Sequence, residues 1–173
     1  ENQMKIIEPL LDYINMLCSH HQPLIDYMIL WCANLIQNPE NKNKIALVIR
    51  GDEGTGKNTF LNILVRMIGE HYYFTTGNGS DLFDKHSTVL RGRLLINLDE
   101  VEIAETAKNI GKLKAWITEK TTSINPKGES IVPIDNFNVF VFTGNNITNI
   151  IRGATDRRYV QLKSSDEKRC DRE

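Results

Sequence analysis

An apolar run that passes directly into a glycine-rich loop constrains the fold of this 173-residue chain more than any other feature. The run is Ile45–Ile49, the loop contains Gly51, Gly54 and Gly56, and Lys57 opens a segment with helical spacing. Glycines let consecutive backbone N–H groups turn towards one polyphosphate, and the helix N-terminus that follows is electropositive. The sequence therefore predicts a phosphate-binding P-loop, in which the lysine ammonium contacts the β- and γ-phosphates.

The P-loop predicts ATP and Mg²⁺ as cofactors. The predicted nucleotide-binding residues are Gly51, Asp52, Glu53, Gly54, Thr55, Gly56, Lys57, Asn58 and Thr59. Asn58 departs from the usual pattern, because Ser or Thr at this position normally places a hydroxyl on the metal. We expect the Asn58 amide oxygen, or the Thr59 hydroxyl, to take that place.

A second apolar run, Leu94–Leu98, ends in the carboxylates of Asp99 and Glu100. The carboxyl ends of parallel strands open into the ligand crevice of such sheets. Asp99 is therefore predicted to hold Mg²⁺, and Glu100 to polarise the attacking water. Acids that merely keep a buried strand soluble are the alternative, but the position of Asp99, 42 residues after Lys57, favours a Walker B motif.

A third apolar run, Phe140–Phe142, leads through Thr143 and Gly144 to Asn145. Its amide could hydrogen-bond the γ-phosphate or the lytic water, so Asn145 is predicted to be a sensor residue. An ordinary turn is an equal alternative, since Gly-Asn-Asn is common turn chemistry.

Two further segments carry candidate cations. Residues 121–135 contain two β-prone stretches around Pro126–Glu129, which predicts a hairpin with Lys127 near its tip. A basic tip suits contact with a nucleic-acid backbone, and a solvated turn is the alternative. Arg157 and Arg158 precede a predicted strand and are candidate arginine fingers; a salt bridge with Asp156 is the competing interpretation.

The remaining pattern predicts an α/β fold. Apolar residues recur at helical spacing over 6–17, 24–36, 60–68 and 105–119, and further apolar runs occupy 138–142 and 159–162. Strands separated by helices predict a three-layer core with a largely parallel central sheet, preceded by a small N-terminal helical subdomain.

The net charge, the cysteines and the hydropathy of the sequence exclude several classes of protein. The net charge of −1 argues against a surface that coats nucleic acid indiscriminately, so any contact with DNA should come from a few placed cations. Three scattered cysteines do not form a disulfide framework, which favours an intracellular protein, and His20 and His21 beside Cys18 lack further metal ligands. No apolar run approaches the roughly 20 residues that span a bilayer, so no membrane is expected as a partner. Because the sequence starts at Glu1 without Met, we expect it to be a piece of a longer protein.

The order of the motifs within about 110 residues resembles that of superfamily 3 helicases, the hexameric DNA helicases of viruses, phages and plasmids. The segment Trp31–Pro39 is similar to the phage and large-DNA-virus branch, in which a poxvirus-type helicase is fused to a primase. The resemblance covers residues 20–163 and implies a role for each matching residue. Lys57 would be the Walker A lysine, Asp99 and Glu100 the Walker B acids, Lys127 the hairpin cation, Asn145 the sensor, and Arg158, with Arg157 second, the finger acting across a subunit boundary.

The resemblance implies an AAA-like P-loop core that hydrolyses ATP between the subunits of a homohexamer and moves on single-stranded or forked DNA. It implies a helical segment (1–43), the ATPase core (44–163) and a tail or the start of a missing C-terminal region (164–173). A primase domain would lie in the same longer chain, and the protein would act at the replication site of an infected cell. A nucleotide or small-molecule kinase, and an ATP-gated module that loads another protein on DNA, are the alternatives.

Overall fold

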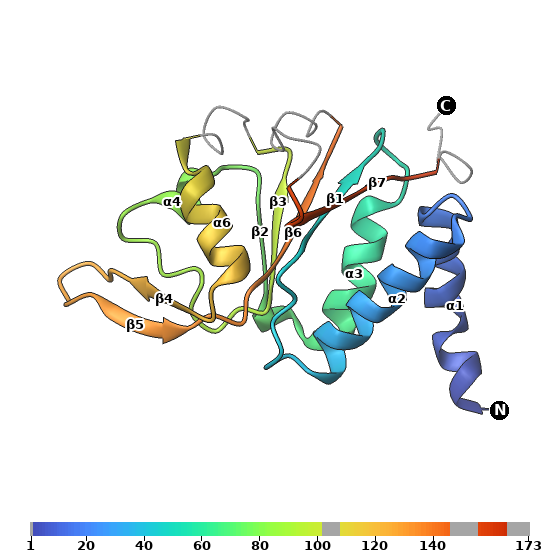
Figure 1. Ribbon diagram of the computed structural model, residues 1–173, viewed down its shortest axis with the longest axis horizontal. Coiled ribbons are helices and arrows are strands. Elements are labelled where there is room, and N and C mark those ends of the chain that lie inside the picture. Colours follow the sequence, from blue (N-terminus) through green and yellow to red (C-terminus); the bar gives the residue numbers. More distant parts are fainter. Residues whose placement is uncertain (1, 102–107, 146–155, 166–173) are drawn as a thin grey trace.

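The computed structural model describes residues 2–101, 108–145 and 156–165, and its centre is a five-stranded sheet (Figure 1). Each neighbouring pair of strands runs parallel, in the order β2-β3-β6-β1-β7. The strands are β1 (Ala46–Arg50), β2 (Tyr73–Thr76), β3 (Leu95–Asp99), β6 (Val139–Gly144) and β7 (Tyr159–Lys163). The expected α/β fold with a mostly parallel sheet is thus confirmed.

Helices cover both faces of the sheet, which explains why its central strands are continuous apolar runs. One face carries α1 (Asn2–Leu17), α2 (Gln22–Gln37) and α3 (Lys57–Ile68), and the other carries α4 (Ser80–Phe83) and α6 (Ile110–Thr118). A 3₁₀ helix, η1 (Glu70–Tyr72), joins α3 to β2. Alternate residues of each strand face opposite layers, so Leu47 packs towards α3 and Val48 towards α6.

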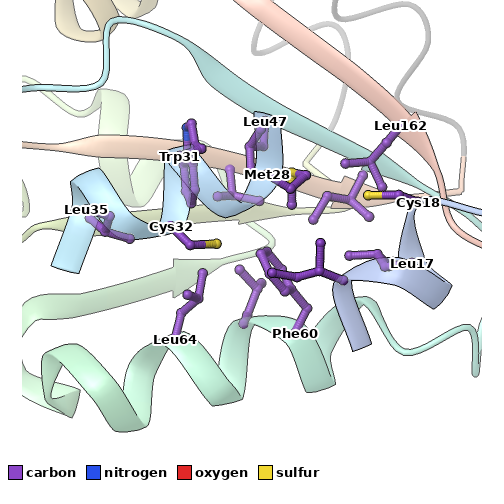
Figure 2. Close-up of a cluster of buried hydrophobic side chains, with 14 of the residues drawn as sticks. Leu17, Cys18, Met28, Trp31, Cys32, Leu35, Leu47, Phe60, Leu64 and Leu162 are labelled. Carbon is purple, nitrogen blue, oxygen red and sulfur yellow. The ribbon is translucent and has the colours of Figure 1, made fainter. Parts of the chain in front are cut away.

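The N-terminal helices share one hydrophobic core with the sheet. Figure 2 shows Met28 and Trp31 of α2 in the same cluster as Leu47 of β1 and Phe60 of α3. Burial of side chains of this size contributes roughly 1.5–3 kcal/mol each, so α2 is held firmly on the sheet. The proposed boundary between residues 43 and 44 falls in the polar connection between α2 and β1.

A separate antiparallel hairpin projects from the layered core. It consists of β4 (Thr121–Ile124) and β5 (Val132–Asp135), and it follows α6 and leads into β6 (Figure 1). Its base is closed by a hydrogen bond from the Asn136 backbone N–H to the Lys120 carbonyl oxygen, 2.8 Å long. The expected hairpin is therefore present, and its base lies at the amino end of β6.

Several elements differ from the sequence-based expectation, and the short helices η1 and α4 were not expected. β2 was not expected, because it is a short edge strand whose Tyr73 and Phe74 are only half-buried and whose Thr75 is exposed. The helix expected over 105–119 corresponds in its described part to α6, while 105–107 lie outside the described residues. No helix in the described ranges combines the length and apolar character needed to cross a bilayer.

Candidate functional site

The carboxyl ends of β1, β3 and β6 meet at one edge of the sheet, beside the N-terminus of α3, and a cavity of about 600 Å³ opens there. Its lining unites the residues predicted from the glycine loop, the second apolar run and the third: Glu53, Gly54, Gly56, Lys57, Asn58, Thr59, Asp99, Glu100 and Asn145. Segments up to 92 positions apart in sequence thus converge on one site.

The glycine loop, residues 51–56, has a shape that side chains would disturb. Gly56 has φ +88°, and a Cβ there would lie 1.8 Å from the Tyr13 hydroxyl oxygen. A Cβ on Gly51 would lie 1.8 Å from the hydroxyl oxygen of Ser164. At Gly56 the left-handed backbone and the close packing both favour glycine, whereas at Gly51 only the close packing against Ser164 does.

Two distant residues brace this loop. Tyr13 of α1 donates a hydrogen bond of 2.7 Å from its hydroxyl to the Gly56 carbonyl oxygen. The Ser164 hydroxyl, just after β7, lies 3.0 Å from the Arg50 carbonyl oxygen and 2.8 Å from Thr55 Oγ1. Neither residue was predicted as part of the site, because contacts over 43 and 109 positions leave no local signal in the sequence.

Lys57 lies folded back on the loop. Its Nζ donates to the carbonyl oxygens of Gly51 and of Asp52, the latter at 2.7 Å, and lies 3.5 Å from Asn145 Oδ1. Burial lowers the pKa of the Lys57 ammonium, and the carboxylates of Glu100 and Asp99 oppose that shift. Phosphate oxygens could replace the neutral carbonyl partners and would bind the ammonium more strongly, because charge-assisted hydrogen bonds are stronger.

The two acids at the end of β3 are held by β6. Asp99 accepts a hydrogen bond of 2.6 Å from the Thr143 hydroxyl, and the Glu100 backbone N–H donates to the Thr143 carbonyl oxygen at 2.8 Å. Glu100 has φ +52°, a left-handed conformation that costs free energy in a non-glycine residue. This turn brings Glu100 to the cavity that Asp99 also lines.

The donor set fits a Mg²⁺ ion that arrives with a polyphosphate. Such ions bind one or two carboxylates and complete their octahedral shell with phosphate oxygens and water. Asp99 offers a carboxylate, and Asn58 an exposed amide oxygen, on the same cavity. Within the described residues no cluster of three His, Cys, Asp or Glu forms a metal site independent of a ligand.

The predicted finger residues lie at the amino ends of the strands, opposite the end at which the cavity opens. Arg157 and Arg158 precede β7, whose first residue pairs with Ala46 at the amino end of β1. Arg158 contacts Asp156 at 3.1 Å, and Lys114 contacts the same carboxylate at 2.8 Å. The hydrogen bond from Lys114 is the main reason that the pKa of Asp156 is lowered. The structure thus contains the salt bridge considered as the competing interpretation, and Arg157 is the more exposed arginine.

Lys127 also lies away from the cavity. It is exposed in the turn between β4 and β5, next to Gly128 with φ +83°. Lys127 is absent from the cavity lining. The base of its hairpin lies at the amino end of β6, whereas the cavity opens at the carboxyl end of that strand.

Comparisons with known proteins match this chain to a family and to a fold. Residues 49–158 match the model of a family described as a family of unknown function, DUF5906. A DNA primase-polymerase of Nitratiruptor phage NrS-1 is 28% identical over 132 residues, which is 75% of this chain and 18% of that protein.

Solved structures of the NrS-1 C-terminal region are similar in fold. One apo structure superposes with a TM-score of 0.79 at 22% identity, covering 94% of this chain and 39% of that one. A second, the A form, has a TM-score of 0.77 at 25% identity, covering 90% and 37%. The chain therefore spans less than a fifth of the curated relative and about two fifths of its C-terminal region.

Proposed function

The chain belongs to the DUF5906 family, and we propose that it is the ATPase core of a superfamily 3 DNA helicase that acts in phage or viral replication. The observation that carries this proposal is the cavity that gathers Lys57, Asp99, Glu100 and Asn145 around a glycine loop at a helix N-terminus. Each residue type in that set has a distinct task in nucleotide hydrolysis.

The loop and its lysine would bind the phosphates. Backbone N–H groups of the glycine loop and the N-terminus of α3 would bind the phosphates, and Lys57 would exchange its carbonyl partners for phosphate oxygens. Asp99 and Asn58 would hold Mg²⁺, which supplies positive charge to the phosphates when it is bound.

The remaining two residues would act on the attacking water. Glu100 is exposed to the cavity and is the candidate to accept the proton of that water. Asn145 lies within 3.5 Å of Lys57 Nζ, so its amide is close to the position expected for the terminal phosphate. Hydrolysis would therefore need both strand ends, β3 and β6, at their present spacing.

The strand order supports a P-loop core of the AAA-like type. β1, which feeds the glycine loop, pairs with β6 and β7, and neither of these is adjacent to it in sequence. Ligands in open parallel sheets bind at the carboxyl ends of two neighbouring strands whose connections lead to opposite sides of the sheet. β1 and β6 are such a pair, because the strand that follows β1 in the chain is β2, at one edge of the sheet, and the strand that follows β6 is β7, at the other. The cavity lies at the carboxyl ends of these strands.

The replication role rests on the phage relative. That protein is described as a DNA primase-polymerase, and this chain is similar to part of it. We infer that the chain works at the replication site of an infected cell, on single-stranded or forked DNA, as part of a homohexamer. A primase domain would lie elsewhere in the same longer polypeptide, because the matched region is a small part of the relative.

The test uses ATP binding, ATP hydrolysis and strand separation by the intact protein. Lys57→Ala should abolish binding of a fluorescent ATP analogue. Glu100→Gln should keep that binding and slow hydrolysis at least tenfold, because only the acceptor of the proton is lost. Glu119→Gln, an exposed acid remote from the cavity lining, is the matched control and should behave like the parent.

Three outcomes decide between the candidates. A parent protein that binds no nucleotide overturns the proposal, as does normal hydrolysis by Glu100→Gln. ATP turnover stimulated by single-stranded DNA, without separation of a fork, would favour the ATP-gated loading module over the helicase.

A further inference from the structure

Two fully buried polar side chains interrupt an otherwise apolar face of the sheet. Thr143 is 0% exposed and Asn97 is 1% exposed, and both lie on the α3 side, next to Val141. A buried polar group costs free energy unless it is hydrogen-bonded, and an apolar residue would avoid that cost. Packing alone therefore does not explain why polar residues occupy these two positions.

The contacts of the pair lead to the candidate metal ligand. Thr143 Oγ1 lies 2.6 Å from Asp99 Oδ1 and 3.1 Å from the side-chain amide of Asn97. The other end of that amide lies 3.2 Å from Thr75 Oγ1. Side chains of three neighbouring strands, β2, β3 and β6, thus form one row that ends at Asp99.

The Thr143 hydroxyl has a single proton, and two acceptors lie within its reach, Asp99 Oδ1 and Asn97 Oδ1. The shorter contact, with the carboxylate, is the stronger bond for this proton. At the other end of the row, the Asn97 amide N–H donates to Thr75 Oγ1. Thr75, Asn97 and Thr143 thus form a continuous row of side-chain contacts that ends at Asp99.

One residue of β6 therefore holds both acids of β3. The Thr143 side chain binds Asp99, and its backbone carbonyl binds the Glu100 N–H at 2.8 Å. The hydrogen bond to Oδ1 fixes the orientation of the Asp99 carboxylate, and lone pairs of the carboxylate remain to bind a cation. Partners of this kind, which bind a metal ligand and not the metal, orient the ligand and raise metal affinity.

We propose that Thr143, supported by Asn97, is a positioning residue that fixes the Asp99 carboxylate for binding of the Mg²⁺–nucleotide complex. The inference rests on the proposed function, since it assigns Asp99 to the metal. It extends that function to two residues that do not line the cavity.

A matched set of variants isolates the hydroxyl. Thr143→Val keeps the shape and removes the donor, while Thr143→Ser keeps the donor. Thr76 is the control, because its hydroxyl also lies at the end of a strand, is buried, and donates to a carboxylate, Asp81, at 2.6 Å. Asp81 does not line the cavity. Thr76→Val therefore removes a bond of the same type and leaves the cavity lining unchanged.

The experiment measures equilibrium binding of fluorescent ADP and ATP analogues to the intact protein over a series of Mg²⁺ concentrations and in EDTA. Thr143→Val should need about ten times more Mg²⁺ for half-maximal binding, the effect typical of losing such a partner. Affinity in EDTA should stay at the parental value. Thr143→Ser should have the same Mg²⁺ dependence as the parent. Thr76→Val should also match the parent at every Mg²⁺ concentration and in EDTA.

Several outcomes would overturn the inference. One is a Mg²⁺ titration of Thr143→Val that overlays the parent; another is an equal shift in Thr76→Val, or no rescue by Thr143→Ser. If Thr143→Val does not fold, as judged by its circular dichroism melting curve, Thr143→Ala removes the same donor with less crowding and must show the same shift. A parent that binds no Mg²⁺–nucleotide overturns the proposed function as well, so the two failures are distinguishable.

Discussion

At the scale of single residues, the Tyr13 hydroxyl connects the N-terminal helix to the glycine loop. It donates to the Gly56 carbonyl oxygen at 2.7 Å and also hydrogen-bonds to Thr59. Burial raises the pKa of Tyr13, so the hydroxyl keeps its proton throughout the neutral pH range. The loop therefore has a permanent donor at its junction with α3.

Removing that donor should weaken nucleotide binding. Tyr13→Phe is expected to raise the Kd of an ATP analogue by about 3- to 10-fold, the equivalent of one net hydrogen bond. Fluorescence titration measures the change. Tyr27→Phe is the control, because Tyr27 is a half-buried tyrosine of α2 that packs on the same core and does not line the cavity. Equal Kd values for Tyr13→Phe and the parent would show that the loop keeps its shape without this bond.

The candidate site illustrates which residues a sequence can reveal. Gly54, Lys57, Asp99 and Asn145 lie at or after the ends of apolar strands, and parallel strands bring such ends together, so their convergence could be expected. Tyr13 and Ser164 could not be found in this way, because only tertiary packing gives them their contacts.

Lys42, outside the site, is another residue whose position could not be predicted from the sequence. It stands in a polar run after α2, and runs of this kind are commonly exposed connections. In the structure it is 9% exposed and donates to Asn136 Oδ1 at 2.8 Å and to the Asn138 carbonyl oxygen at 2.7 Å. A solvated lysine and a buried one cannot be told apart without knowing what packs over the segment.

At the scale of elements, apolar runs predicted the three strands that are buried on both faces and one of the two edge strands. The runs at 45–49, 94–98 and 138–142 correspond to β1, β3 and β6, and the run at 159–162 corresponds to the edge strand β7, within two residues at each end. β2, at the other edge of the sheet, lacks such a run because its last two residues, Thr75 and Thr76, are polar. Its position follows instead from pairing with β3, which is a tertiary effect.

The hairpin of β4 and β5 gives a prediction about DNA. Lys127→Ala should weaken binding of single-stranded DNA and lower the slope of log affinity against log salt by about 0.7, because one phosphate contact is lost. ATP hydrolysis without DNA should stay near the parental rate, since Lys127 does not line the cavity. Salt titrations of a labelled oligonucleotide measure the slope.

The control removes the same charge at the other end of the sheet. Lys163 is exposed at the carboxyl end of β7, and Lys163→Ala should leave both affinity and salt slope unchanged. If Lys127→Ala also binds like the parent, the turn is a solvated surface feature and the hairpin has no role in DNA contact.

At the scale of the whole molecule, the cavity and the finger candidates lie at opposite edges of one sheet. An arginine at the amino edge could reach a cavity only on a neighbouring subunit. Arg158 is the finger implied by the superfamily 3 resemblance. In the described chain, however, Arg158 is paired with Asp156, whereas Arg157 is exposed.

Subunit mixing tests this arrangement in the assembled protein. Lys57→Ala subunits lack their own site, and Arg158→Ala subunits lack the donated arginine, so each alone should be inactive. Random mixing in equal amounts should restore about a quarter of parental ATPase activity, because a quarter of the interfaces pair an intact site with an intact finger. No recovery in a ring shown by native mass spectrometry to be mixed would exclude Arg158 as the finger. Recovery in the same experiment with Arg157→Ala would then assign the role to Arg157.

The strand order also has a consequence for synthesis of the protein. β1 is made early, yet its two partners, β6 and β7, begin at residues 139 and 159. At translation rates of about 5–20 residues per second, both edges of β1 remain without a partner for roughly 5 to 20 seconds. During that interval an apolar strand with open edges is attached to the ribosome, where a chaperone or a second nascent chain can bind it.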